Sequence, residues 1–386
     1  MKDEIIVAID ASRNRSGGAK NHINGILANS DPRHFGIKEV HLWSYSDLLN
    51  SIPDYPWLVK HNPKWLEKNI VSQIIWQKYI YHKELYKYNC NILYSTTAIN
   101  FCNFKPIVVM SRELLSFDPR YKKLYCFTFQ RARLEIIKFI QTKIFKKADG
   151  IIFLTRYANH VVEKNIGNLY DFKIIPHGIN NHFRNVEINT RWFYNTVQNV
   201  SCIYISDIHR YKNHEKLIQA IKILIKKGYS LRLTLIGDIV EKKTFKKVKN
   251  LVNRLDLNKY IIILGKVKND ELVYILKNSM IFIFASGCEN LPNILLEGMA
   301  SGLPIASSSK GPMPEILKDA AIYFDPEDPA SIANSLEILI NDVSLRYEMS
   351  LRAKNYSMSF DWKICAEKTW KYIVEVYYKY TSKRIF

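Results

Sequence analysis

The segment from Ile281 to Ile316, IFIFASGCENLPNILLEGMASGLPIASSSKGPMPEI, constrains the fold of this chain more than any other. It opens with the apolar run Ile281–Ala285, which has the length of a buried parallel strand. A polar turn follows, and then a helical pattern with Pro292 near its first turn and Asn290 as the expected N-cap. The segment therefore predicts a parallel α/β sheet with a helix N-terminus at the end of one strand, an arrangement that binds phosphate or diphosphate.

Two carboxylates bracket this expected pocket. Glu289 belongs to the turn, and Glu297 lies about two turns further along the predicted helix. A carboxylate is a poor ligand for phosphate but a good acceptor for hydroxyl groups. Both residues are therefore expected to bind sugar or ribose hydroxyls that flank the phosphate.

The pattern Glu-x7-Glu, followed by GMASGLPI and GPMPEI, resembles the donor-binding core of the retaining glycosyltransferase family 4. It is similar in particular to bacterial surface-polysaccharide mannosyl- and rhamnosyltransferases. The resemblance is specific over residues 200–345 and loose over the first half of the chain. It implies a GT-B fold of the α/β class, with two doubly wound Rossmann-like domains facing each other across a cleft. It also implies a nucleotide-diphospho sugar as co-substrate, with no cofactor and no metal.

Strand-like apolar segments alternate with helical ones along the chain, which is typical of parallel doubly wound sheets. A length of 386 residues suits two such domains. With the resemblance, this predicts an acceptor-side domain over 1–186, a donor domain over 199–360, a final helix over 361–386 that crosses back to the first domain, and a polar linker over 185–198. The expected strands are Ile5–Ile9, Val40–Trp43, Asn91–Tyr94, Pro106–Met110, Gly150–Leu154, Lys173–Pro176, Ser201–Ser206, Arg232–Ile236, Ile261–Leu264 and Ile281–Ala285.

The resemblance also assigns a donor site. The run DIHRYKNH from Asp207 resembles a family turn in which an Arg and a Lys neutralise the donor diphosphate. Lys212 fits the Lys position, whereas Asp207 stands where the Arg is expected, so Arg210 is the predicted replacement. Lys212 and Glu289 are the predicted catalytic residues, and Glu297 is expected to hold the ribose. The predicted donor-binding residues are Gly17, Gly18, Arg210, Lys212, Gly265, Lys266, Val267, Glu289, Asn290, Leu291, Pro292, Asn293 and Glu297.

The acceptor side departs from the family pattern. Many members carry a His-Asp pair after the strand that ends near Met110, and Arg112-Glu113 stands in that place here. His177 lies in a Pro-His-Gly turn that resembles the end of the family's first domain. No second His or Cys stands at ligand spacing from His177, so it is not a predicted metal ligand. Arg112, Glu113 and His177 are the acceptor-side candidates.

The charge and composition suggest the kind of partner and the cellular location of the chain. Fifty-six Lys and Arg against 36 Asp and Glu give a net charge of +20, which favours an anionic partner or reflects an AT-rich genome. The basic helical stretch Tyr121–Lys147 could lie on an anionic membrane or could be an ordinary amphipathic helix. The acidic start, six scattered cysteines and the lack of a long apolar run predict a cytoplasmic protein, peripheral at most to the inner face of the plasma membrane.

These observations predict a retaining hexosyltransferase of surface-polysaccharide biosynthesis (O-antigen, capsule or lipopolysaccharide), with GDP-mannose as the favoured donor and a glycan, expected to be lipid-linked, as acceptor. A UDP-hexose or UDP-N-acetylhexosamine donor is the first alternative. A catalytically silent GT-B subunit that partners another transferase is the second. A nucleic-acid-binding protein is supported by charge alone, because no nucleic-acid-binding motif is present.

Overall fold

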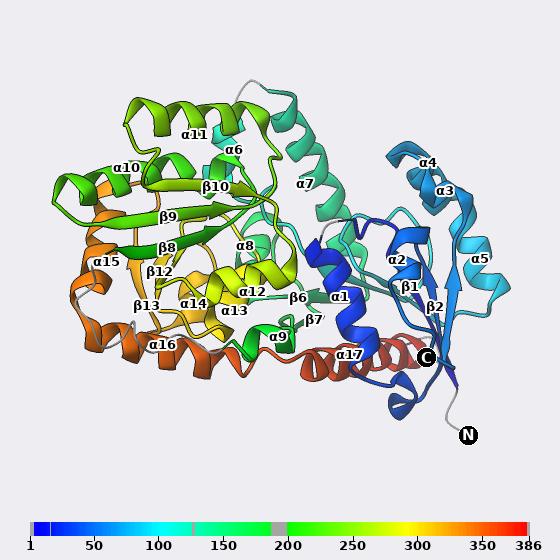
Figure 1. Ribbon diagram of the computed structural model, residues 1–386. Coiled ribbons are helices and arrows are strands. Elements are labelled where there is room, and N and C mark those ends of the chain that lie inside the picture. Colours follow the sequence, from blue (N-terminus) through cyan, green and yellow to red (C-terminus); the bar gives the residue numbers. More distant parts are fainter. Residues whose placement is uncertain (1–3, 16, 126–127, 187–198, 384–386) are drawn as a thin grey trace. The chain divides into compact units, whose positions relative to one another are not determined.

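The computed structural model describes residues 4–15, 17–125, 128–186 and 199–383. The chain forms two compact units (Figure 1). Unit 1 comprises Met1–Phe117, Phe127–Gly178 and Asp361–Phe386, and unit 2 comprises Asp118–Cys126 and Ile179–Phe360. Each unit is built on one sheet whose paired strands are all parallel. The predicted fold class, two doubly wound Rossmann-like sheets, is confirmed.

The sheet of unit 1 has seven strands in the order β3-β2-β1-β4-β5-β6-β7. Its central strands are fully buried apolar runs, as expected of a parallel sheet covered on both faces. The strands are β1 (Ile5–Asp10), β2 (Ile37–Trp43), β3 (Leu58–His61), β4 (Ile92–Ser95), β5 (Ile107–Ser111), β6 (Gly150–Phe153) and β7 (Phe172–Ile174). The edge strand β3 is half-buried and was not predicted from the sequence.

The helices of unit 1 include one that comes from the far end of the chain. Helix α17 (Trp362–Ser382) is capped by the Asp361 carboxylate, which accepts from the backbone N–H groups of Lys363 and Ile364. It packs on α1 (Gly17–Ala28), where a Cβ on Gly25 would lie 2.3 Å from the Trp362 ring, so only glycine fits there. The other helices are η1 (Pro32–Phe35), α2 (Ser46–Asn50), α3 (Lys64–Glu67), α4 (Ile70–Ile75), η2 (Trp76–Ile80), α5 (Tyr81–Lys87), α7 (Phe129–Lys147) and α8 (Arg156–Ile166).

The sheet of unit 2 has six strands in the order β10-β9-β8-β11-β12-β13, with helices on both of its faces (Figure 1). The strands are β8 (Val200–Ile205), β9 (Leu231–Ile236), β10 (Ile261–Gly265), β11 (Ile281–Phe284), β12 (Ile305–Ser308) and β13 (Ala321–Phe324). The helices are α6 (Pro119–Lys122), η3 (Lys123–Tyr125), α9 (Asn181–Arg184), η5 (Arg210–Lys212), α10 (His214–Lys226), α11 (Lys242–Arg254), α12 (Asn269–Lys277), α13 (Asn293–Ala300), α14 (Met313–Leu317), α15 (Pro329–Asn341) and α16 (Val343–Ser357).

Two local predictions are wrong. The stretch Tyr121–Lys147 is not one helix, because it contains α6, η3 and α7, and its first part belongs to unit 2 while α7 belongs to unit 1. Helix α13 begins at Asn293 with Pro292 as its N-cap residue, so Asn290 lies in the preceding loop and is not the cap. Residues 187–198 of the predicted linker lie outside the described part of the chain.

Candidate functional site

The sheet of unit 2 has a point at which the strand order reverses. The chain passes from β8 to β9 and β10 on one side, and then to β11, β12 and β13 on the other. Loops at the carboxyl ends of the two strands beside such a point flank a crevice, which is where open parallel sheets bind their ligands. The loop after β8 carries Lys212, and the loop after β11 carries Glu289. The topology therefore brings the two predicted catalytic residues to the same place.

Lys212 and Glu289 form an ion pair in which Nζ donates to Oε1 of the carboxylate. Each side chain is only 14% exposed, so the pair is largely withdrawn from water. Two hydrogen bonds to backbone carbonyl oxygens hold the two loops together. The side chain of Asn213 donates to the carbonyl oxygen of Ala285 at 3.0 Å, and the N–H of Gly287 donates to the carbonyl oxygen of Tyr211 at 2.8 Å.

Glu297 lies in α13 and is half-buried. Among the described residues, its carboxyl group has no hydrogen-bond or ion-pair partner. Burial raises the pKa of this carboxyl to about 8. A partly desolvated carboxyl group without a hydrogen-bond partner among the described residues is available to bind hydroxyl groups of a ligand.

The start of α13 completes the crevice. Asn290 and Leu291 are buried in the loop that leads to Pro292 and to the first helical residue, Asn293. The first N–H groups of a helix have no intrahelical acceptor, and the helix dipole places a partial positive charge there. Together with Lys212, this end of α13 offers positive charge to a diphosphate.

Arg210 is held in a different direction from the one predicted. Its Nη1 donates to the carbonyl oxygen of Leu124 at 2.6 Å, and its Nε lies 3.7 Å from the carboxylate of Glu241. Its guanidinium lies 5.4 Å from the centre of the Tyr125 ring. In the described structure Arg210 is thus joined to η3 and Glu241, and its side chain forms no hydrogen bond or ion pair with Lys212 or Glu289. Asp207, in the family's Arg position, accepts from the N–H of Asp238 at 2.9 Å.

The loop after β10 lies at the same edge of the sheet. Gly265 has φ +71 and accepts from the N–H of Gly237 at 2.9 Å, which ties this loop to the end of β9. Lys266 is exposed, with its Nζ 3.9 Å from the Asp238 carboxylate. Val267 follows as a half-buried residue. The three residues therefore form a turn beside the end of β9, in the place where the resemblance puts the nucleotide base.

Tyr121 is a neighbour of this site that sequence reasoning missed. A Cβ on Gly287 would lie 2.0 Å from the Tyr121 hydroxyl oxygen, so any larger residue at this position would require the Tyr121 ring to move. Tyr121 is held by α6, which Asp118 caps by accepting from the N–H of Arg120. The sequence did contain a signal for this helix, because Asp118 followed by Pro119 is typical of a helix N-terminus.

In unit 1 the strand order reverses between β1 and β4, and the loop after β1 leads to Gly17 and Gly18 at the start of α1. Arg112 and Glu113 follow β5 directly. Arg112 is half-buried and Glu113 is exposed. His177 is buried, with its ring centre 4.9 Å from that of His22 and 5.5 Å from that of Trp362. The predicted acceptor-side residues are therefore polar groups at the carboxyl edge of the unit 1 sheet.

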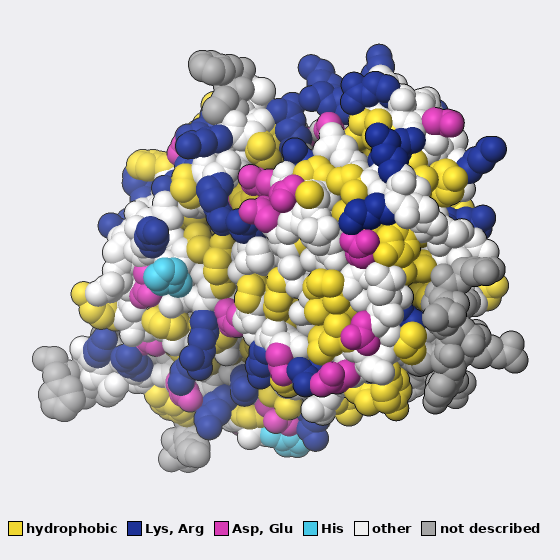
Figure 2. Space-filling model, turned by 90° about the vertical axis from the view of Figure 1, so that its left-hand side faces the viewer, with side chains coloured by type: hydrophobic (Ala, Val, Ile, Leu, Met, Phe, Trp, Pro, Cys, Tyr) yellow, Lys and Arg dark blue, Asp and Glu magenta, His cyan; other side chains and the backbone are white. Residues whose placement is uncertain are grey.

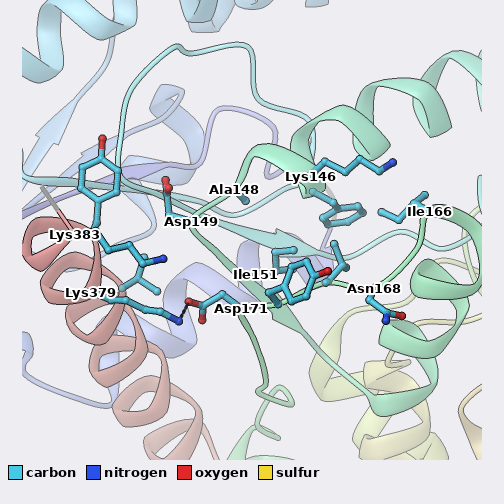
Figure 3. Close-up of a pocket in the computed structure, with 14 residues that line it drawn as sticks. Lys146, Ala148, Asp149, Ile151, Ile166, Asn168, Asp171, Lys379 and Lys383 are labelled. Carbon is cyan, nitrogen blue, oxygen red and sulfur yellow. Dashed lines mark hydrogen bonds and ion pairs between the residues drawn. The ribbon is translucent and has the colours of Figure 1, made fainter. Parts of the chain in front are cut away.

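A cavity of about 670 Å³ in unit 1 lies elsewhere (Figure 3). Asp149 and Asp171, which line it, directly precede β6 and β7, so the cavity lies at the amino edge of the sheet. Its acids are already paired, Asp171 with Lys379 and Asp149 with Lys105. This cavity is thus remote from the ends of the strands that carry the predicted site.

The basic charge does not gather in one patch on the face in Figure 2. Lys and Arg side chains are spread over most of that face, with acidic and hydrophobic side chains between them. Within the described ranges, no helix combines the length and apolar character needed to cross a bilayer.

Comparisons with known proteins found similar sequences and similar folds. Residues 195–356 match the family model for glycosyl transferases group 1. This segment is therefore similar to the group 1 glycosyl transferases. It accounts for most of unit 2 and contains Lys212, Glu289 and Glu297.

Similar sequences have been named as glycosyltransferases. An uncharacterized glycosyltransferase of Methanocaldococcus jannaschii is 24% identical over 220 residues, which are 56% of this chain and 57% of that protein. The O-antigen chain mannosyltransferase B of Escherichia coli is 27% identical over 167 residues, 43% of this chain and 44% of that protein. The chain thus spans about half the length of these curated relatives. The domain match and the relatives support the prediction of a glycosyltransferase enzyme.

Solved structures share the fold over nearly the whole chain. Sucrose-phosphate synthase from Thermosynechococcus elongatus superposes with a TM-score of 0.74 at 14% identity, covering 98% of this chain and 100% of that chain. HepE of Anabaena, in complex with UDP-glucose, has a TM-score of 0.71 at 15% identity, covering 96% of this chain and 99% of that chain. These likenesses show that this chain has the fold of those proteins.

Proposed function

We propose that this chain is a retaining glycosyltransferase that moves a hexose from a nucleotide-diphospho sugar to a glycan acceptor. The observation that carries the proposal is the constellation at the strand reversal of unit 2. One cation, two carboxyl groups and a helix N-terminus come together there on loops that are tied to each other. This set supplies positive charge for a diphosphate and acceptors for the hydroxyls on either side of it.

In this proposal the ion pair opens when the donor binds. The Lys212 ammonium turns from Glu289 to the diphosphate and stabilises the negative charge that develops as the glycosidic bond to the phosphate breaks. The N–H groups at the start of α13 act in the same way. Glu289, released from Lys212, accepts from hydroxyls of the transferred sugar, and Glu297 accepts from those of the ribose. Retention of anomeric configuration is proposed from the family resemblance.

GDP-mannose is the favoured donor in this proposal, and the named mannosyltransferase relative supports it. A UDP-sugar is the alternative, supported by the HepE structure that holds UDP-glucose. The acceptor is proposed to be a glycan of a surface polysaccharide, O-antigen, capsule or lipopolysaccharide, carried on a lipid.

A peripheral location at the inner face of the plasma membrane would suit a lipid-linked acceptor. Helix α7 supports it, because three large hydrophobic side chains on this helix, Phe129, Ile136 and Phe139, are exposed. The Lys143 ammonium lies 4.2 Å from the centre of the Phe139 ring. Exposed apolar side chains beside Lys residues are typical of helices that lie in a membrane interface.

A panel of nucleotide sugars tests the function. The chain should be stabilised against heat by one of GDP-mannose, a UDP-hexose or a UDP-N-acetylhexosamine, without added metal, and should transfer that sugar to an acceptor. Stabilisation without turnover on any lipid-linked acceptor would instead favour a catalytically silent subunit. A chain that binds DNA or RNA and is stabilised by no nucleotide sugar would contradict the proposal.

A further inference from the structure

Two arginines at the carboxyl edge of the unit 1 sheet have guanidinium nitrogens that lack a hydrogen-bond partner in the described structure. Arg13 lies in the loop after β1, and Arg112 follows β5 directly. Both side chains are half-buried. The Nε and Nη2 atoms of Arg13, and the Nε and Nη1 atoms of Arg112, are buried without a hydrogen-bond partner among the described residues.

This situation is unusual within the described chain. The other buried or half-buried arginines there all donate to, or pair with, a named group. They are Arg131, Arg184, Arg346 and Arg352. Arg15, in the same loop as Arg13, also has partners: its guanidinium donates to the carbonyl oxygen of Leu66 at 2.5 Å and lies 4.0 Å from the centre of the Tyr45 ring. Among the described arginines, Arg13 and Arg112 are therefore those with two buried guanidinium nitrogens outside any hydrogen bond, although the Arg13 guanidinium lies 5.8 Å from the centre of the Phe101 ring.

The neighbouring acids, Asp10 and Glu113, attract these cations through space but form no hydrogen bond or ion pair with them in the described structure. Asp10 is buried, and its carboxylate already accepts from Gln77 at 2.6 Å, Asn100 at 2.7 Å and the N–H of Ser12 at 3.0 Å. Glu113 lies within electrostatic range of both arginines but is exposed, and no ion pair joins it to either. A buried guanidinium with unused N–H groups is costly unless an anion satisfies it.

A third polar atom at this edge is also unused. His22 in α1 bonds through Nε2 to the Tyr94 hydroxyl at 2.8 Å, while its Nδ1 is buried without a partner in the described structure. The Arg112 guanidinium lies within electrostatic range of this ring. Arg13, Arg112 and His22 come from three different segments that follow or flank β1 and β5. Arg13 and Arg112 share Glu113 as an electrostatic neighbour, and Arg112 is also a neighbour of His22, so the three groups lie in one region of this edge. Their N–H groups are suited to bind an oxyanion such as a phosphate.

We propose that Arg13 and Arg112 bind the phosphate ester of a phosphorylated acceptor, with the His22 ring beside it. The inference rests on the proposed glycosyltransferase function, in which the donor diphosphate is bound in unit 2. The phosphate has two chemical sources, a soluble sugar phosphate or the phosphate that links a sugar to a lipid. The enzyme thus glycosylates an acceptor that carries a phosphate group rather than a neutral glycan.

Inorganic phosphate is the probe, titrated into the full chain by calorimetry with and without saturating GDP and UDP. Phosphate should bind equally well in the presence of the nucleotide. R13Q and R112Q should each weaken phosphate binding about tenfold or more, because each removes charge-assisted hydrogen bonds, and should leave nucleotide binding unchanged. R15Q is the matched control in the same loop and should bind phosphate like wild type.

Several results would overturn the proposal. Phosphate binding that GDP or UDP abolishes would assign the arginines to the donor diphosphate. Phosphate affinity unchanged in R112Q, or no phosphate binding by wild type, would remove the site. If R112Q does not fold, R13Q and R112K replace it, and R112K should weaken binding because it keeps the charge but loses the planar fork.

Further probes identify the source of the phosphate. Tighter binding of mannose 6-phosphate than of farnesyl phosphate would assign a soluble acceptor, and the reverse order would assign a lipid-linked one. Glucuronate binding more tightly than either would contradict the phosphate assignment. Since nucleotide binding in unit 2 is measured on the same samples, failure of this proposal is distinguishable from failure of the proposed function.

Discussion

The Nζ atom of Lys212 donates to the Glu289 carboxylate across 77 positions of sequence, so that the two predicted catalytic residues neutralise each other. Neither loop could present its charge to a ligand without first breaking this pair. In our account the donor diphosphate replaces Glu289 as the partner of Lys212. The pair thus keeps two charged side chains in place in a crevice that is partly withdrawn from water.

Replacing Lys212 by Met should slow the chemical step more than it weakens donor binding. Loss of one group that stabilises charge in the transition state costs on the order of 100- to 1,000-fold in kcat. The measurement is steady-state turnover with the preferred nucleotide sugar. K222M is the control, because Lys222 in α10 donates to the carbonyl oxygen of Leu255 and has no role in the proposed site. A K212M enzyme with wild-type kcat would show that Lys212 does not assist the leaving group.

The stability of the protein should depend on pH through Glu297. Burial raises the pKa of this carboxyl from the model-peptide value of 4.5 to about 8. Between these two values the folded chain keeps a proton that the unfolded chain has released, so the free energy of unfolding falls as pH rises. Urea unfolding midpoints should decline over this range for wild type and decline less for E297Q. Identical slopes in the two proteins would mean that Glu297 is ionised in the folded state.

Chelation should not abolish turnover. The positive charge opposite the leaving diphosphate is proposed to come from Lys212 and from N–H groups of α13. Activity measured after dialysis against EDTA should equal that of the untreated enzyme. Loss of activity that manganese or magnesium restores would show that a metal, held by acids such as Asp207 and Asp238, performs this role instead.

Membrane binding should depend on α7. Lys143, Lys146 and Lys147 are exposed at its end, whereas Lys122, which the sequence places in the same basic stretch, is buried in unit 2. Each basic residue at an anionic surface contributes about 1 kcal/mol, and the attraction is screened within about 8 Å at physiological salt. The protein should therefore sediment with anionic vesicles at low salt, ignore neutral ones and dissociate as salt rises.

The triple variant K143E/K146E/K147E should lose this sedimentation but keep activity on a soluble acceptor. The control is K242E/K243E/K246E, which makes the same change of charge on the exposed face of α11. Equal loss in both variants would mean that the net charge, and not α7, drives binding. Undiminished sedimentation of the α7 variant would exclude this helix as the membrane contact.

Much of the fold could be predicted from the sequence because its central strands are continuous apolar runs. The strand Ile281–Phe284 and the helix after it follow directly from this pattern. The edge strand Leu58–His61 could not be found, because it is only half-buried and has no such run. The division of Tyr121–Lys147 among α6, η3 and α7 could not be predicted, because basic and apolar residues recur along most of this stretch.

The site was predictable in part. Motif order placed Lys212, Glu289 and Glu297 on loops and a helix at one sheet edge. The sequence could not show that Lys212 and Glu289 pair, because their contact depends on how β8 and β11 lie side by side. It also could not show that Arg210 points to Glu241 and Leu124, since that direction is set by a segment 86 positions earlier.

Donor titration of Glu297→Ala tests the central claim most directly. Wild type should bind one nucleotide sugar, with GDP-mannose favoured, in isothermal titration calorimetry. Loss of the carboxyl group leaves a hydroxyl of the bound ligand without its hydrogen bond, which costs about 1–3 kcal/mol, so the variant should bind roughly one to two decades more weakly while keeping its thermal stability. E271A, on the exposed face of α12, should bind like wild type. Donor affinity in E297A equal to that of wild type would contradict the assignment of the nucleotide-sugar site to the strand reversal of unit 2.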